Sequence, residues 1–416
     1  MNIFVGVIIG LLVLMTLVTA HEFGHFLAAR RNGVRVLEFG ICFPPRAIAW
    51  VKDPKTKKWT RLKKADWNKP QEGLIFSLNW LPIGGFCQMD GESANDKRKG
   101  TFGHSSFWSK TKILFAGVAM NWLLAFIILT ILAWTGMPKL IENQFTMKND
   151  ETVVNRGHVT ISEVLEETPA AKAGLKANDV IIAIGGQEVF STSAVSEYNS
   201  AHAGEKVDYT IMRPTTEEEA CEECKDSDQD CSCELILNVE LGTTDMDYIL
   251  GVAMTSPQTF YTYTWSAPIV AAGLTGQLTG ETFKGVGDLI WNLVSGVVNQ
   301  FNPNEETRQK GQQALETASE SVSGPVGIIG VIFPAFTSAG PSNLGFLAAL
   351  ISISLACMNV LPIPALDGGR WLLIAIYKLR KKELSKEKEE KIVSRAFMVL
   401  LAIIAVITIL DIIRLF

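Results

Sequence analysis

The chain has 416 residues, of which 48% are hydrophobic and 19% are charged, and its formal net charge is −5. Soluble domains carry about 25% charged residues, so this composition favours a membrane protein, and the negative net charge predicts no nucleic-acid partner. Four apolar stretches predict four transmembrane helices, because each can cross a hydrocarbon core of about 30 Å. With the motifs that adjoin them, these segments are residues 1–26, 113–134, 344–370 and 396–415.

The first apolar stretch runs directly into the sequence HEFGH, which matches the pattern H-E-x-x-H. On a helix, His21 and His25 lie one turn apart on the same face, so both imidazoles can reach one metal ion. Glu22 lies beside that face and can take a proton from a metal-bound water. A cleaved signal peptide is the alternative for this stretch, but it needs a basic start, and residue 2 is Asn. Ionisable groups at membrane depth are costly, so the cluster predicts a site rather than a packed core.

Residues 27–112 follow as a loop, and the sequence GLIFSLNWLPIGGFCQMDGE (73–92) within it predicts strands joined at LPIGG. Gly84 and Gly85 permit a turn or the close approach of another backbone. We expect a membrane-associated β-hairpin here, and an ordinary hairpin is the alternative.

Residues 153–247 predict a small α+β domain, with a strand, a short helix that starts near Pro169, a second strand and a tight turn at Gly185-Gly186. This stretch resembles a PDZ domain, and such domains bind extended peptides by adding a strand to their sheet. A peptide ligand is one expectation for this domain, and a folded spacer is the other.

A cysteine-rich insert occupies residues 217–234. Its four cysteines favour two disulfides, for which three connectivities exist, but a metal site or free thiols are alternatives that the spacing leaves open. The residues concerned are Cys221, Cys224, Cys231 and Cys233.

Residues 265–301 carry apolar side chains at helical spacing with polar residues between them. This pattern predicts an amphipathic helix that lies at the outer membrane surface or packs on the acidic domain.

Charge in the segments between the spans predicts the orientation. Residues 27–112 carry 17 Lys and Arg against 7 Asp and Glu, residues 135–247 carry 8 against 23, and residues 361–395 carry 9 against 5. Because Lys and Arg concentrate on the cytoplasmic side, the first and third segments are predicted to be cytoplasmic. Residues 371–395 then form a basic cytoplasmic helix, and the acidic domain lies outside the cytoplasm.

A third metal ligand is needed, since hydrolytic zinc sites have three protein ligands. The other histidines lie in the cytoplasmic loop or on the outer domain. Asp367, in the sequence NVLPIPALDGGR (359–370), directly follows the third span and reaches the same membrane depth as His21. Pro362 and Pro364 break the helix there and expose backbone groups.

The motifs HEFGH, LPIGGF, SGPVGI (323–328) and NVLPIPALDGGR occur in this order around the PDZ-like insert. This combination resembles the site-2 protease family of intramembrane zinc metalloproteases, in the bacterial form related to the regulator-of-sigma-E protease, here with a single PDZ domain. The resemblance covers nearly the whole chain.

The resemblance implies a Zn²⁺ cofactor and a role for each residue that matches a motif. His21, His25 and Asp367 would bind the zinc ion, and Glu22 would be the general base. Asn359 would hold the substrate or the oxyanion. The remaining residues assigned to substrate binding are Gly84, Gly85 and Phe86 of the hairpin and the two prolines, Pro362 and Pro364.

The resemblance also implies a polytopic α-helical membrane protein with a cytoplasmic-side β-hairpin and an inserted extracytoplasmic PDZ-like domain. The expected location is the bacterial inner membrane, with the active site toward the cytoplasm. The expected substrates are single-span membrane proteins in the lipid bilayer, such as anti-sigma factors or remnant signal peptides. A helical substrate must unwind before cleavage, because its amides are engaged in internal hydrogen bonds.

Three features depart from the family pattern: one PDZ domain in place of two, Val118 where proline is frequent, and the cysteine-rich insert. A non-catalytic scaffold that recruits peptides is an alternative function, but the intact Glu22 disfavours it. A transporter or channel is disfavoured because the proposed ligands lie on one side of the membrane only.

Overall fold

The computed structural model describes most of the chain, in two compact units that we treat separately. The described residues are 3–67, 69, 71–92, 96–141, 143–214, 232–243, 248–255, 258–320 and 324–415. The first unit is formed by residues 1–137, 145–150 and 263–416, and the second by residues 138–144 and 151–262.

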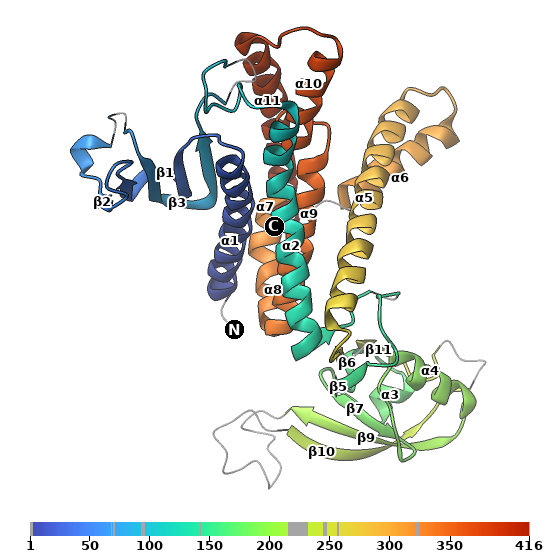
Figure 1. The fold of residues 1–416 in the computed structure, drawn as a ribbon. Coiled ribbons are helices and arrows are strands. Elements are labelled where there is room, and N and C mark those ends of the chain that lie inside the picture. The colour runs from blue at the N-terminus through green and yellow to red at the C-terminus, as the bar shows by residue number, and fades with distance from the viewer. Residues whose placement is uncertain are drawn as a thin grey trace. The chain divides into compact units, whose positions relative to one another are not determined.

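Four helices of the first unit are long and apolar enough to cross a membrane, as the composition predicts. They are α1 (Ile3–Arg31), α2 (Phe107–Thr135), α9 (Pro341–Val360) and α11 (Lys386–Leu415). Helix α2 packs against both α1 and α9 (Figure 1). Its side chains from Ile113 to Ala133 that face these neighbours are buried. This packing puts α1 and α9, which are distant in sequence, on either side of α2.

The loop after α1 forms a sheet of bent strands with the order β2-β1-β3. The strands are β1 (Val36–Lys52), β2 (Trp59–Arg61) and β3 (Leu74–Met89), with a 3-10 turn, η1, at Lys64–Asp66. Ile41 of β1 pairs with Gly85 on one side and with Leu78 on the other, because β3 folds back around β1. The end of β3, residues 85–89, is therefore an edge that no other described strand covers, and it lies beside α1 (Figure 1).

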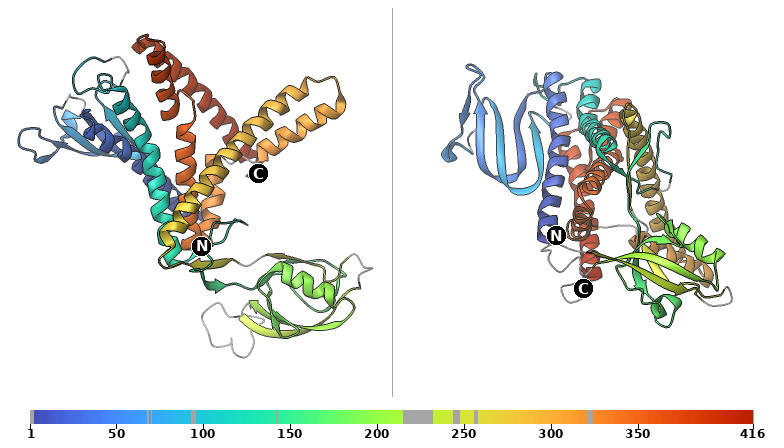
Figure 2. Two further views of the ribbon diagram at one scale, coloured as in Figure 1. Left: turned by 45° about the vertical axis from the view of Figure 1, so that its right-hand side comes forward. Right: turned by 90° about the horizontal axis from the view of Figure 1, so that it is seen from below.

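The segment between α2 and α9 contains a helical hairpin and a short broken helix. Helix α5 (Ala267–Gln300) packs its first turns on α2 and α9 through Val270, Ala271 and Leu274, and its later turns contact α6 (Glu305–Glu320) (Figure 2). The predicted amphipathic helix of residues 265–301 thus corresponds to α5, and its place at a membrane surface stays a prediction. The broken helix consists of α7 (Pro325–Gly327), the π-helix η3 (Ile328–Ile332) and α8 (Phe333–Ser338). After α9, helix α10 (Asp367–Leu379) leads to α11.

The second unit is an α+β domain. Its main sheet has the strand order β10-β9-β7-β6-β11, with β8 paired to β7, and β12 pairs with β5 in a smaller sheet. A buried core that includes Ile161, Ile181, Tyr209 and Ile211 lies within it. The strand β4 (Met137–Pro138) begins at the last residue of a segment of the first unit. The elements of the second unit are β5 (Thr152–Arg156), β6 (Val159–Val164), α3 (Pro169–Lys172), β7 (Val180–Ile184), β8 (Gln187–Glu188), α4 (Thr192–Ala201), β9 (Lys206–Pro214), β10 (Ser232–Glu240), β11 (Val252–Thr255) and β12 (Thr259–Thr262).

The cysteine-rich insert falls largely outside the described residues. Cys221, Cys224 and Cys231 are not among them, whereas Cys233 lies buried at the start of β10 and is disulfide-bonded. The two disulfides expected for the insert stay a prediction, and the choice among the three connectivities stays open.

Candidate active site

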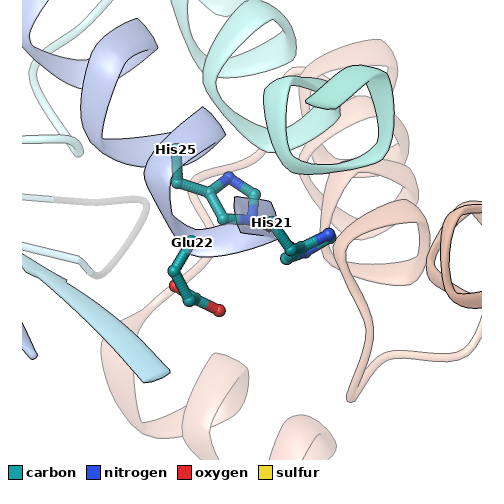
Figure 3. Close-up of side chains that lie close together, drawn as sticks. All are labelled: His21, Glu22 and His25. Carbon is teal, nitrogen blue, oxygen red and sulfur yellow. Dashed lines mark hydrogen bonds between the residues drawn. The ribbon is translucent and has the colours of Figure 1, made fainter. Parts of the chain in front are cut away.

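Helix α1 brings His21 and His25 together, one turn apart and on one face. Both side chains are buried, and their Nε2 atoms lie 3.1 Å apart. Figure 3 shows the side chains of His21, Glu22 and His25 close together on successive turns of the helix. Ligand atoms of His21, Glu22 and His25 all lie within 4.8 Å of one another. The local spacing therefore produces the cluster that the sequence predicts.

Asp367, the first residue of α10, joins this cluster from the far end of the chain. Its Oδ2 atom lies 3.1 Å from Nε2 of His21 and 3.2 Å from Nε2 of His25. Ligands about 2.0 Å from a tetrahedral zinc ion lie about 3.3 Å from one another. The three donor atoms thus have the spacing and the chemical character of a zinc site, two imidazole nitrogens and one carboxylate oxygen.

The hydrogen bond of the second ring nitrogen fixes the tautomer of His25. Its Nδ1 lies 2.8 Å from the backbone carbonyl of Ile113, which can only accept, so Nδ1 carries the proton. The lone pair of Nε2 is then free to bind a metal ion. A backbone carbonyl in this position also fixes the orientation of the ring.

Asn121 of α2 contacts the second ring nitrogen of His21, as the carbonyl of Ile113 does for His25. The sequence did not predict this residue. The amide of Asn121 lies 3.3 Å from Nδ1 of His21, the residue is fully buried, and its Oδ1 has no hydrogen-bond partner among the described residues. Amide oxygen and nitrogen are interchangeable in shape, so turning the amide places Oδ1 toward His21. Oδ1 then accepts from Nδ1–H, and Nε2 of His21 is free for the metal.

Glycines allow α1 and α2 to approach closely at the site. A Cβ atom on Gly117 of α2 would lie 2.6 Å from Nε2 of both His21 and His25, and one on Gly24 of α1 would lie 2.3 Å from the carbonyl oxygen of Ala116. Real side chains do not tolerate such distances, so these two positions require glycine. The close crossing places the imidazoles directly against the backbone of α2.

The turn between α9 and α10 contains the other residues predicted around Asp367. Asn359 lies on the last turn of α9, where its side chain donates to the carbonyl of Leu355 at 2.9 Å. Pro362 is exposed, and Pro364 lines the same cavity as Asp367. Cβ atoms on the two following glycines would lie within about 2.1 Å of backbone oxygens in this turn, so the turn depends on Gly368 and Gly369.

Strand β3 brings the predicted hairpin residues next to α1. Gly84 has a φ of +78°, and a Cβ on Gly85 would lie 3.3 Å from Oγ1 of Thr19 on α1. The ring of Phe86 covers Gly40 of β1. The backbone N–H of Cys87, next along the strand, lies within reach of the Glu22 carboxylate. This edge of β3, which pairs with no other described strand, therefore passes beside the proposed general base.

A cavity of about 910 Å³ connects these elements. It is lined by Gln88 and Met89 from the end of β3, by Pro364 and Asp367, and by polar residues of α10 and α11. The cavity therefore adjoins both the end of β3 and Asp367.

Residues 9–404 match the family model for Peptidase family M50. Zinc metalloprotease RasP of Bacillus licheniformis is 25% identical over 99% of this chain and 99% of that protein. Membrane metalloprotease ARASP, chloroplastic, of Arabidopsis thaliana is 27% identical over 96% of this chain and 76% of that protein. Zinc metalloprotease RasP of Shouchella clausii is 29% identical over 76% of this chain and 62% of that protein.

Proposed function

Because the chain belongs to peptidase family M50 and is a zinc metalloprotease of the site-2 protease type, we propose that it cleaves transmembrane segments of single-span membrane proteins within the bilayer. In this proposal His21, His25 and Asp367 bind the zinc ion. The observation that carries it is the convergence of three donor atoms within 3.2 Å. Two of them belong to α1, which is apolar enough to span a membrane, and the third belongs to the first residue of α10.

The chemistry of the reaction is divided between the metal and Glu22. When bound, zinc supplies polarisation of the scissile carbonyl and lowers the pKa of water. Glu22 takes the proton from the attacking water and delivers it to the leaving amine nitrogen. The carbonyl of Ile113 and the amide of Asn121 hold the two imidazoles in the orientation that ligation requires. Asn359 is proposed to hold the substrate backbone from the turn before α10.

We propose that the substrate binds as an extended strand along residues 85–89 of β3. A transmembrane helix hides its amides in internal hydrogen bonds, and strand addition to a sheet edge satisfies those amides after the helix unwinds. This edge is unpaired among the described strands and lies beside Glu22 through Cys87. Gly85, without a side chain, allows close approach of the substrate backbone.

The second unit is proposed to be a PDZ-like peptide-binding domain outside the cytoplasm. Its edge strand β11 and helix α4 border a groove of about 410 Å³, which includes Ser196, Asn199 and Val252. The domain would act as a size filter that admits substrates whose outer part has already been removed. Deletion of residues 153–245 should then accelerate cleavage of intact, uncut substrates, and an unchanged slow rate would contradict the filter.

The orientation is proposed from the charge distribution, with the active site toward the cytoplasm of a bacterial inner membrane. In this proposal the substrates are single-span membrane proteins, such as anti-sigma factors, or remnant signal peptides. A non-catalytic scaffold is the competing function, and it differs because it needs no proton acceptor at residue 22.

Glu22→Gln in the full-length protein separates the two functions. The variant should retain zinc, since the three ligands are unchanged, but should lose cleavage of a single-span reporter protein in proteoliposomes. Glu383→Gln, a change at an exposed carboxylate, is the control and should cleave normally. Undiminished cleavage by Glu22→Gln would rule out this site as the catalytic one.

A further inference from the structure

Arg370 lies one turn after Asp367 on α10 and reaches three other parts of the first unit. Its Nη2 donates to the backbone carbonyl of Glu92, in the loop after β3. Its Nε lies 3.4 Å from Oε1 of Glu389 on α11, and the guanidinium lies 5.1 Å from the ring centre of Phe102. The Arg370 side chain is 24% exposed, so these contacts occur largely out of water.

The partners of Arg370 are more deeply buried than Arg370 itself. Glu389 is 4% exposed and Phe102 is fully buried. Lys110 of α2, which is 8% exposed, places its Nζ 5.8 Å from the centre of the Phe102 ring. We refer to Phe102, Lys110, Arg370 and Glu389 as the Arg370 cluster. A buried carboxylate that loses its cation leaves an uncompensated charge, which strongly destabilises a fold. The cluster is therefore a fixed connection between α2, α10 and α11.

A neighbouring pair shows how this connection differs from an ordinary surface contact. Lys386 and Glu390 of α11 lie 3.8 Å apart, but both side chains are about two-thirds exposed. Exposed pairs of this kind contribute little to stability. Farther along α11 most large apolar side chains, such as Met398 and Val399, are not covered by other parts of the chain. Glu389 thus connects α11 to α10 through Arg370, close to Asp367.

Helix α10 needs such an attachment because the turn before it contains Pro362 and Pro364 and its own first turn contains Gly368 and Gly369. On one side Trp371 donates from Nε1 to Oγ1 of Thr111 on α2 at 2.9 Å. On the other side Arg370 connects α10 to Glu389 and Glu92. Together these bonds restrain the first turn of α10 against rotation, and that turn carries Asp367.

We propose that Arg370, held by Glu389, is a positioning residue that keeps the Asp367 carboxylate in place to complete the zinc site. The proposal rests on the assignment of Asp367 as a zinc ligand. Groups that orient metal ligands typically change metal affinity by 10- to 100-fold when they are removed.

The test measures zinc affinity of the detergent-purified full chain by competition with a chelator. Arg370→Met keeps the length of the side chain but removes its charge and donors, and we expect zinc affinity to fall by about 10- to 100-fold. Arg370→Lys, which keeps the charge near Glu389 and Phe102, should recover part of the affinity. Glu390→Gln, a change at the exposed carboxylate next to Glu389, is the matched control and should bind zinc normally.

A double variant separates positioning from the cost of a buried charge. Arg370→Met alone leaves Glu389 with Lys110 as its remaining nearby cation, whereas Arg370→Met with Glu389→Gln removes the carboxylate as well and should recover part of the thermal stability of the zinc-free protein. The proposal expects the zinc affinity of the double variant to stay reduced. Normal zinc affinity of the double variant would overturn it, because Arg370 would then act only by compensating Glu389.

Asp367→Asn distinguishes this inference from the proposed function on which it rests. If Asp367→Asn leaves zinc affinity unchanged, the ligand set itself is wrong. If Asp367→Asn abolishes zinc binding while the double variant binds zinc normally, only the role of Arg370 fails.

Discussion

At the scale of single residues, the site shows which side chains a sequence can identify and which it cannot. His21, Glu22 and His25 are predictable because their relation depends only on helical periodicity. Asn121 is one amide in an apolar span, and its relevance depends on which face of α2 meets α1. That face is set by packing at Gly24 and Gly117, which no local pattern specifies.

Asn121 should affect the metal through His21. Asn121→Leu removes the acceptor for Nδ1–H while keeping a similar size, so we expect zinc affinity to fall by about 10- to 100-fold. Chelator competition measures the change. Thr130→Val, which alters a polar residue elsewhere on α2, is the control, and equal losses in both variants would contradict a specific role for Asn121.

Gly117 should tolerate no side chain. In Gly117→Ala the new methyl group would meet Nε2 of both histidines at 2.6 Å, so the imidazoles or α2 must shift. We expect loss of bound zinc, measured as metal content after purification, and loss of reporter cleavage. Gly285→Ala on α5 has open space around its Cβ and should be neutral. Full zinc content in Gly117→Ala would show that the helices separate more easily than the close crossing suggests.

At the scale of elements, helix α5 begins at a carboxylate that lies far from it in sequence. Asp150 accepts hydrogen bonds from the backbone N–H and hydroxyl groups of both Thr264 and Ser266. These bonds, first of all those from the hydroxyl groups, lower the pKa of Asp150 from 3.8 to about 2. The folded protein therefore favours the ionised carboxylate.

This shift predicts a pH dependence for the start of α5. Because the pKa is lowered on folding, the stabilisation is complete above about pH 4 and is lost as the pH falls toward 2. Amide-exchange protection in the first turn of α5, corrected for intrinsic rates, should decrease over that range in the wild type and change little in Asp150→Asn. Asp288→Asn, on the same helix, should keep the wild-type dependence. An identical pH profile in wild type and Asp150→Asn would contradict this assignment.

Some elements can be predicted from composition, whereas others depend on contacts between distant parts of the chain. The four apolar helices were predictable, because length and hydropathy suffice. The fold-back of β3 around β1 was not, since a hairpin pattern does not reveal that Ile41 pairs on both sides. That fold-back decides which edge remains open, and so the part of β3 that we propose binds substrate. The attachment of α11 at Glu389 was also not predicted, because Glu389 lies in a charged stretch that resembles a solvated helix.

At the scale of the whole molecule, the proposed ligands all belong to the first unit. Zinc removal should therefore destabilise that unit and leave the second unit unchanged. A ligand at 100 times its dissociation constant stabilises its binding state by about 2.7 kcal/mol. Hydrogen–deuterium exchange with and without chelator should show faster exchange in α1 and α10 but not in β7 or β9. Equal changes in both units would contradict a metal site confined to the first.

The separation of the ligands along the chain has a consequence for how the protein is made. His21 and His25 are synthesised first, whereas Asp367 follows 346 residues after His21. A nascent chain that lacks α10 holds only two of the three proposed ligands, with Glu22 already in place beside them. The peptidase would thus stay inert until α10 has been translated, after the spans α1, α2 and α9 that precede it.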